Sequence, residues 1–178
     1  MPDLTGNKIL IIIAYEGFQN LEFKPVYDYL SMFGANVKVG STSIGTAQGS
    51  EGGSAEVDML LTDIHPEDYN AIIYIGGPGA KSLTEDNDAL KIAKLAATHC
   101  DVLAAICIAP TILARAGALF GRRATVWTSS ENNSAANVLT NAQAKYSDKD
   151  VVVDGNIVTA NGPESAQKFV ETLAEMLP

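Results

Sequence analysis

Hydrophobic residues form continuous runs in some parts of the chain and helical patterns in others. Uninterrupted apolar runs occupy residues 8–14, 70–75 and 101–106, which is typical of strands buried on both faces of a parallel sheet. The segments predicted to be helical are 21–33, 87–98, 110–116 and 166–177. Helices that alternate with strands predict an α/β fold, in which an open and mostly parallel sheet is covered on both sides.

Shorter segments complete this pattern. Residues 36–39 form a further predicted strand. Residues 40–54 are rich in Gly, Ser and Thr, and they predict a hairpin ahead of a strand over residues 55–61. The Asp154-Gly155 pair predicts a second hairpin within residues 151–159.

Length and charge narrow the class of protein. The chain has 178 residues, 47% of them hydrophobic, which fits one globular domain over residues 1–178 and excludes disorder. It carries 12 Lys and Arg residues against 21 Asp and Glu residues, a formal net charge of −9. Such a surface repels nucleic acid and anionic membranes, so we expect small molecules or other proteins as partners, with no nucleic acid and no membrane.

Targeting signals and metal-ligating residues are scarce. Residues 1–8 are polar and lack the regions of a signal peptide, so we expect a cytoplasmic protein. The chain has two cysteines, Cys100 and Cys107, and two histidines, His65 and His99. A zinc site of the usual type needs three or four such ligands, so we expect no metal and no other cofactor.

Cys107 follows a predicted buried strand and precedes a predicted helix. In an open parallel sheet the functional site lies beyond the carboxyl ends of the strands. Ala105 and Ala109 lie two residues to either side of Cys107, and the sharp turn of a nucleophile elbow requires such small neighbours. Pro110 suits the first turn of the helix, whose N-terminus would stabilise a thiolate. The alternative is that Cys107 is an ordinary apolar core residue.

The positions of the histidines argue against a cysteine-histidine pair. His99 precedes the strand that ends before Cys107, and at about 3.3 Å per residue this strand separates the two by roughly 20 Å. His65 also precedes a strand, so we expect both histidines at the amino edge of the sheet. The same distance excludes a disulfide between Cys100 and Cys107.

Acids and glycines follow other strands at the same edge as Cys107. Glu22 opens the first predicted helix beside an apolar stretch, so burial can raise its pKa and let it share a proton with Cys107. Alternatively, Glu22 is a helix N-terminal carboxylate that the helix dipole favours. Glu16 is expected to be a more solvated loop acid. The backbone N–H groups of Gly76-Gly77 and of Ile108 are candidates for an oxyanion hole.

These segments, in this order, resemble the PfpI superfamily, which contains the Parkinsonism-associated deglycase, intracellular-protease-like proteins and several glyoxalases. The resemblance runs from about Lys8 to Leu177, and its most specific segments are residues 17–22, 75–79, 104–110 and 151–156. It implies a homodimer with a flavodoxin-like three-layer sandwich of the class I glutamine amidotransferase-like type. It also implies a reactive cysteine at Cys107, a paired glutamate at Glu22, and oxyanion-binding amides at Gly77 and Ile108.

Two positions depart from the family pattern. Members described as proteases carry histidine directly after the cysteine, where this chain has Ile108. The chain therefore lacks the general base that the protease interpretation requires. Members with glyoxalase or deglycase activity often carry histidine near the position of Trp127. The indole either forms one wall of an apolar pocket above Cys107, contributes to a dimer contact or only packs against neighbouring residues. Glu16, Gly76 and Trp127 are thus further candidates for a pocket.

The leading interpretation is a cysteine-dependent enzyme that acts on small reactive carbonyl compounds, of the glutathione-independent glyoxalase or deglycase type. The Cys107 thiolate would add to an aldehyde, and Glu22 would shuttle protons. A second interpretation is a redox-responsive stress protein or chaperone-like protein in which Cys107 oxidises to a sulfinate. A third is an amidase, a hydratase or a protease-like hydrolase that uses the same thiolate on another electrophile.

Overall fold

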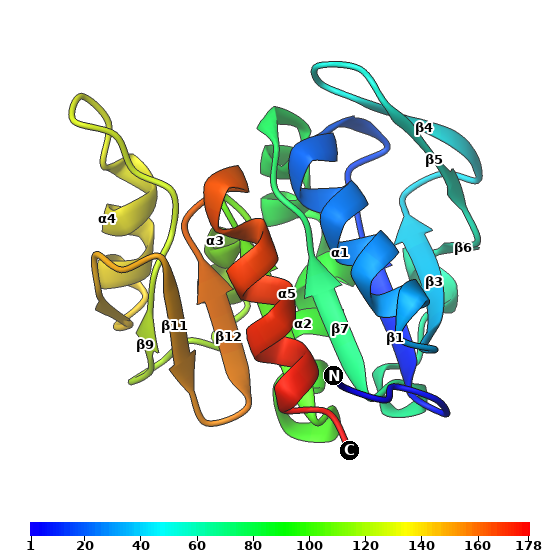
Figure 1. Cartoon of the computed structure of the whole chain (residues 1–178). Helices are drawn as coiled ribbons and strands as arrows, with labels where there is room; N and C mark the ends of the chain where they lie inside the picture. Colours follow the sequence, from blue (N-terminus) through cyan, green and yellow to red (C-terminus); the bar gives the residue numbers. More distant parts are fainter.

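A seven-stranded sheet forms the centre of the computed structural model, which describes all of residues 1–178 (Figure 1). From one edge to the other, its strands are β11 (Val151–Asp154), β12 (Ile157–Ala160), β8 (Val102–Ile106), β7 (Ala71–Tyr74), β1 (Lys8–Ile12), β3 (Asn36–Ser41) and β6 (Met59–Leu60). All neighbouring pairs are parallel except β11 and β12, which form the predicted hairpin at one edge. The open, mostly parallel sheet that the sequence predicts is therefore confirmed.

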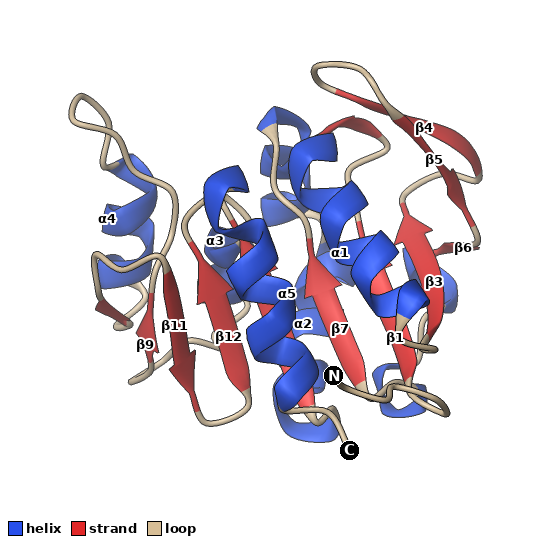
Figure 2. Ribbon diagram, in the orientation of Figure 1, coloured by secondary structure: helices blue, strands red, loops and turns tan.

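Helices cover both faces of this sheet (Figure 2). They are α1 (Asn20–Met32), α2 (Asn87–His99), α3 (Pro110–Arg115), α4 (Ser134–Asn141) and α5 (Ala166–Glu175). Successive residues of β1 face opposite layers, because side chains alternate along a strand. Ile9 and Ile11 belong to the core that α1 and α5 cover, whereas Leu10 and Ile12 belong to the core that α2, α3 and α4 cover. The expected flavodoxin-like three-layer sandwich is confirmed.

Two small sheets and four short 3₁₀ helices lie outside the main sheet. The strands β2 (Glu16–Phe18), β4 (Gly45–Gly49) and β5 (Ser54–Val57) form one small sheet, and β9 (Arg123–Ala124) and β10 (Lys145–Tyr146) form the other. The 3₁₀ helices are η1 (Leu61–Asp63), η2 (Pro66–Asp68), η3 (Pro78–Glu85) and η4 (Pro163–Ser165). The antiparallel pairing of β4 with β5 confirms the hairpin expected after β3.

The segment predicted as one strand over residues 55–61 is divided between two sheets. Its first part belongs to β5 and pairs with β4, whereas Met59 and Leu60 form β6 and pair with β3. Asp58 lies at the break, where its carboxylate accepts a hydrogen bond from the Val39 N–H over 2.8 Å. The prediction of a single strand is wrong, because a polar side chain separates two different strand pairings.

The strands that carry the candidate residues end level with one another. Ile12 of β1 pairs with Tyr74 of β7, and Tyr74 pairs with Ala105 of β8. The segments that follow these strands therefore start from one edge of the sheet. This edge brings Glu22 and Cys107, which are far apart in the sequence, to the same place.

Candidate active site

Cys107 occupies a strained turn between β8 and α3. Its φ of 63° lies in the left-handed region, which costs a residue other than glycine about 1–2 kcal/mol. Two backbone hydrogen bonds hold the turn. The Cys107 N–H donates to the Ala160 carbonyl over 2.9 Å, and the Trp127 N–H donates to the Cys107 carbonyl over 2.8 Å. The backbone thus has the geometry of the predicted nucleophile elbow.

Glu22, in the first turn of α1, is buried beside this elbow. Its side chain has no exposed surface, and its Oε1 accepts a hydrogen bond from the Gly76 N–H over 2.9 Å. Its Oε2 is buried without a hydrogen-bond partner. Burial raises the pKa of Glu22 to about 7, although the Gly76 N–H and the Cys107 thiol oppose that rise. Glu22 therefore changes its charge near neutral pH, which an ordinary helix N-terminal carboxylate does not.

The Cys107 thiol and the Glu22 carboxyl group control each other's ionisation. Burial raises the pKa of Cys107, and the negative charge of Glu22 raises it further. The N–H groups of Ile108 and Gly77 act on the sulfur in the opposite direction and lower this pKa. The sequence predicted a thiolate stabilised by the following helix, but burial and an ionised Glu22 outweigh that effect. The ionisation of Cys107 and Glu22 is therefore coupled, because a negative charge on one group disfavours a negative charge on the other.

Gly76 and Gly77 let the end of β7 approach both Cys107 and Glu22. A Cβ atom on Gly76 would lie 2.7 Å from Cys107 Cβ and 2.9 Å from Glu22 Oε1, so only glycine fits there. Gly77 has a φ of 109°, and a Cβ atom at this position would lie 2.5 Å from the Gln19 nitrogen. Because neither glycine has a side chain, the Gly76 N–H can reach Glu22 and the Gly77 N–H can act on Cys107.

A cavity of about 600 Å³ opens at Cys107. The predicted site residues that line it are Gly77, Cys107, Ile108 and Trp127. Gly76 is not in the lining, since it lies between Cys107 and Glu22 instead. Glu16 is exposed on β2, in the small sheet, and does not line the cavity either. The prediction that Glu16 belongs to this pocket is therefore wrong, because the side chain is in solvent.

Neither histidine reaches this cavity. His99 ends α2, and its Nδ1 lies 2.9 Å from the Leu95 carbonyl oxygen. His65 precedes η2, before the start of β7. Cys100 is buried at that same end of the sheet, where its thiol donates a hydrogen bond to the Pro66 carbonyl over 3.3 Å. The groups that this chain brings together at Cys107 are thus a thiol, a carboxyl group and backbone N–H groups.

The cavity also contains polar residues that the sequence patterns did not reveal. Lys81 and Thr84 line it from η3, and Thr111 and Arg115 line it from α3. Three of the four η3 residues in the lining, Pro78, Lys81 and Thr84, are spaced three positions apart, which is the period of a 3₁₀ helix. This spacing could have predicted the lining residues only if residues 78–85 were already known to form a 3₁₀ helix.

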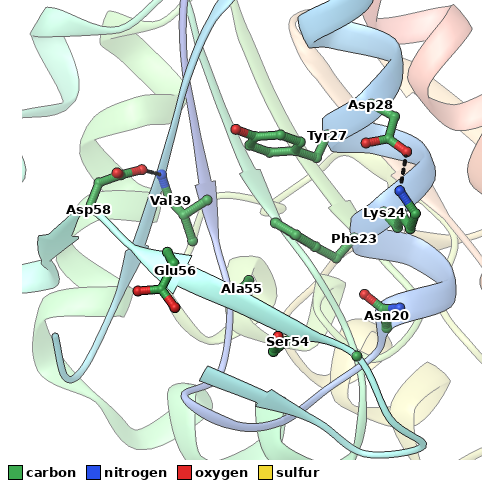
Figure 3. Close-up of a pocket in the computed structure, with 11 residues that line it drawn as sticks. Asn20, Phe23, Lys24, Tyr27, Asp28, Val39, Ser54, Ala55, Glu56 and Asp58 are labelled. Atoms are coloured by element: carbon green, nitrogen blue, oxygen red, sulfur yellow. Dashed lines mark hydrogen bonds and ion pairs between the residues drawn. The ribbon is translucent and has the colours of Figure 1, made fainter. Parts of the chain in front are cut away.

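A second cavity, of about 450 Å³, lies between α1 and β5 (Figure 3). Phe23 and Tyr27 line it from α1, and Glu56 and Asp58 line it from the strand side. It contains neither a cysteine nor any of the predicted site residues. We therefore assign the chemistry to the cavity at Cys107.

No group of three or more His, Cys, Asp or Glu side chains is arranged to hold a metal ion. None of the helices is both long enough and apolar enough to cross a membrane.

The sequence matches a known family along almost its whole length. The DJ-1/PfpI family matches residues 7–176. An uncharacterized protein from Methanocaldococcus jannaschii is 39% identical over 94% of this chain and 80% of its own length. The deglycase PfpI from Pyrococcus furiosus is 29% identical over 96% of this chain and 99% of its own length.

Solved structures of similar proteins share the fold. A ThiJ/PfpI domain protein from Brachyspira murdochii has a TM-score of 0.88 at 29% identity, over 97% of this chain and 96% of that chain. Drosophila melanogaster DJ-1beta has a TM-score of 0.85 at 29% identity, over 96% of this chain and 90% of that chain. The match of sequence and fold over this length shows that the chain belongs to the DJ-1/PfpI family.

Proposed function

We propose that this protein is a cysteine-dependent enzyme that acts on small reactive carbonyl compounds, of the glutathione-independent glyoxalase or deglycase type. The observation that carries the proposal is the pairing of Cys107 with the buried carboxyl group of Glu22 at a cavity large enough for a small substrate. A nucleophile and an acid that lie side by side are suited to addition to a carbonyl group, in which one attacks carbon and the other protonates oxygen.

The first step is addition to the aldehyde group of a 2-oxoaldehyde. The Cys107 sulfur attacks the aldehyde carbon, an S–C bond forms, and the π electrons of the carbonyl move to oxygen. The N–H groups of Gly77 and Ile108 stabilise that oxygen, and Glu22 gives it a proton. The product is a hemithioacetal, and Glu22 is left as a carboxylate.

The second step is a proton shift between neighbouring carbons. Glu22 removes the proton from the hemithioacetal carbon and returns a proton to the adjacent carbon, while the proton of the hemithioacetal hydroxyl passes to the ketone oxygen. The first carbon is oxidised to a thioester while the ketone carbon is reduced to an alcohol, so no external oxidant is needed. Water then hydrolyses the thioester, which releases a 2-hydroxy acid and restores Cys107. A pKa near 7 suits a group that acts in turn as acid and base.

The test is the conversion of methylglyoxal to lactate by the purified protein. We expect lactate to form with the wild-type chain and to fall to the uncatalysed rate with Cys107→Ala. Equal rates for the wild-type chain and Cys107→Ala would contradict the proposal.

The names of several relatives favour deglycation as a second candidate reaction. Three relatives from Pyrococcus species are named deglycases, at 28% to 29% identity. In this reaction the sulfur attacks the carbinol carbon of an aldehyde-amine adduct, and the amine leaves with a proton from Glu22. Amine release from a preformed methylglyoxal adduct is measured with a scavenger of free aldehyde present. Cys107-dependent release that persists with the scavenger supports deglycation, and its loss supports action on the free aldehyde.

A further inference from the structure

The cavity at Cys107 carries two cationic side chains without partners. Lys81 on η3 and Arg115 at the end of α3 both line it, and neither forms a salt bridge within the chain. One acid, Glu85, is also in the lining and is likewise unpaired. Charged side chains in the lining therefore sum to a positive charge, although the whole chain has a formal net charge of −9.

Both cations lie on the walls of the cavity that contains the Cys107 thiol. Thr111 and Arg115 both line the cavity, and their spacing of four residues puts them on one face of α3, which begins three residues after Cys107. Arg115 lies five residues beyond Pro110, the first residue of α3, a rise of about 8 Å at helical geometry. Its side chain leans back toward the N-terminus of the helix, and therefore toward the thiol. Lys81 lies on the cavity side of η3.

The exposure of these cations places them at the mouth of the cavity. Lys81 and Arg115 are both exposed, whereas Cys107 is partly buried and Glu22 is fully buried. The cavity thus has the Cys107 thiol at its inner end, with the buried Glu22 beside the thiol but outside the lining, and unpaired cations at its outer end. A molecule that spans it meets a nucleophile at one end and positive charge at the other.

We propose that the substrate is a short carbonyl compound that carries an anionic group, either a carboxylate or a phosphate, which binds to Arg115 and Lys81 while the carbonyl group meets Cys107. The inference deepens the proposed function and rests on Cys107 as its nucleophile. Arg115 presents a planar fork of donors that matches both kinds of anion, and Lys81 adds a point charge. Attraction at the mouth also offsets the repulsion between an anionic substrate and the charge of the Cys107–Glu22 pair.

The experiment compares two alkylating reagents that differ in charge. In both, the Cys107 sulfur attacks the methylene carbon, an S–C bond forms, the C–I bond breaks, iodide leaves with the electron pair, and the thiol proton passes to the buffer. Iodoacetate is anionic and iodoacetamide is neutral. The ratio of their rates at Cys107, measured by peptide mass spectrometry at low salt, reports the attraction of the cavity for an anion and requires no turnover.

We expect Arg115→Gln and Lys81→Gln each to lower this ratio about three- to fivefold, the size expected of a solvent-exposed ion pair. Arg115→Lys keeps the charge and should retain most of the wild-type ratio. Lys168→Gln removes an exposed lysine on α5, which covers the opposite face of the sheet, and is the matched control for net charge. The proposal is overturned if Arg115→Gln and Lys81→Gln give the same ratio as Lys168→Gln.

A second measurement identifies the anion. Glyoxylate, glycolaldehyde phosphate and the neutral glycolaldehyde are each tested for protection of Cys107 against iodoacetamide. Stronger protection by glyoxylate assigns a carboxylate, and stronger protection by glycolaldehyde phosphate assigns a phosphate. Protection by both anions no better than by the neutral aldehyde would overturn the proposal. Because these readouts do not depend on lactate formation, they separate failure of the substrate class from failure of the proposed reaction.

Discussion

The backbone N–H of Trp127 donates a hydrogen bond to the carbonyl oxygen of Cys107 over 2.8 Å. This bond fastens the segment that carries the indole to the elbow that carries the thiol. It involves only main-chain atoms, so it persists when the indole is changed. The Trp127 side chain, which is 36% exposed, is then free to act as a wall of the cavity.

Truncation of this wall is expected to affect substrate binding more than folding. For Trp127→Ala we expect the free energy of unfolding to fall by about 1–2 kcal/mol, less than for a fully buried aromatic residue. The KM for the carbonyl substrate should rise about three- to tenfold, with kcat nearly unchanged, because the elbow keeps its backbone bonds. Steady-state kinetics and denaturant titration measure the two effects, and Trp127→Phe serves as the milder control. An unchanged KM in Trp127→Ala would show that the indole does not contact the substrate.

The Glu22→Gln variant separates the acid-base role of Glu22 from its effect on the thiol. The negative charge of Glu22 raises the pKa of Cys107, so its removal should lower that pKa and speed alkylation by iodoacetamide severalfold at a fixed pH near 8. Carbonyl turnover should nevertheless fall by about 100-fold or more, because the group that moves the proton is gone. Alkylation kinetics and the lactate assay give the two readouts.

Glu16→Gln is the control for this experiment, because Glu16 is an exposed acid outside the cavity. It should leave both rates at the wild-type level. Slower alkylation together with slower turnover in Glu22→Gln would mean that Glu22 supports the thiolate and does not oppose it.

The buried carboxyl group also predicts how stability depends on pH. Burial raises the pKa of Glu22 from its ordinary value of 4.5 to about 7, so the folded chain binds this proton more tightly than the unfolded chain does. The resulting stabilisation is complete below pH 4.5 and is lost as the pH rises to about 7. At about 1.4 kcal/mol per pKa unit, the loss is on the order of 3 kcal/mol.

Denaturant titrations of the wild-type chain and Glu22→Gln at several pH values between about 4 and 8 test this dependence. The difference in unfolding free energy between the two proteins should shift in favour of Glu22→Gln as the pH rises. Parallel pH profiles for the two proteins would argue against a raised pKa at Glu22.

The close approach at Gly76 predicts a severe effect of one methyl group. A Cβ atom there would lie 2.7 Å from Cys107 Cβ and 2.9 Å from Glu22 Oε1, so Gly76→Ala must displace the reactive pair. We expect the unfolding free energy to fall by about 1–3 kcal/mol and carbonyl turnover to fall at least tenfold. Gly162→Ala is the matched control, because its Cβ atom would meet only Trp127 Cδ1 at 3.7 Å. Equal losses in the two variants would refute the steric explanation.

The sequence by itself predicted the alternation of the main strands and helices, although not α4, and it selected Cys107 and Glu22 as candidates for a reactive pair. Strand and helix periods are local properties, so the runs at 8–14 and 101–106 predicted β1 and β8 without knowledge of their neighbours. The small residues around Cys107 predicted an elbow, because that turn tolerates little else. Glu22 was selected because parallel strands end at one edge of the sheet, which brings the residues that follow them together.

Only the tertiary structure shows which side chains and backbone amides lie next to one another at the site. The pKa of the Cys107–Glu22 pair depends on burial and on the Gly76 and Gly77 amides, which reach the pair from another strand. The split of residues 55–61 depends on which strands lie beside them. The cavity wall that carries Lys81 and Arg115 arises where η3 and α3 converge. The periodicity of one segment does not show which distant segments pack against it. The burial of a side chain, its pKa and the shape of the cavity all depend on that packing, so they required the tertiary structure.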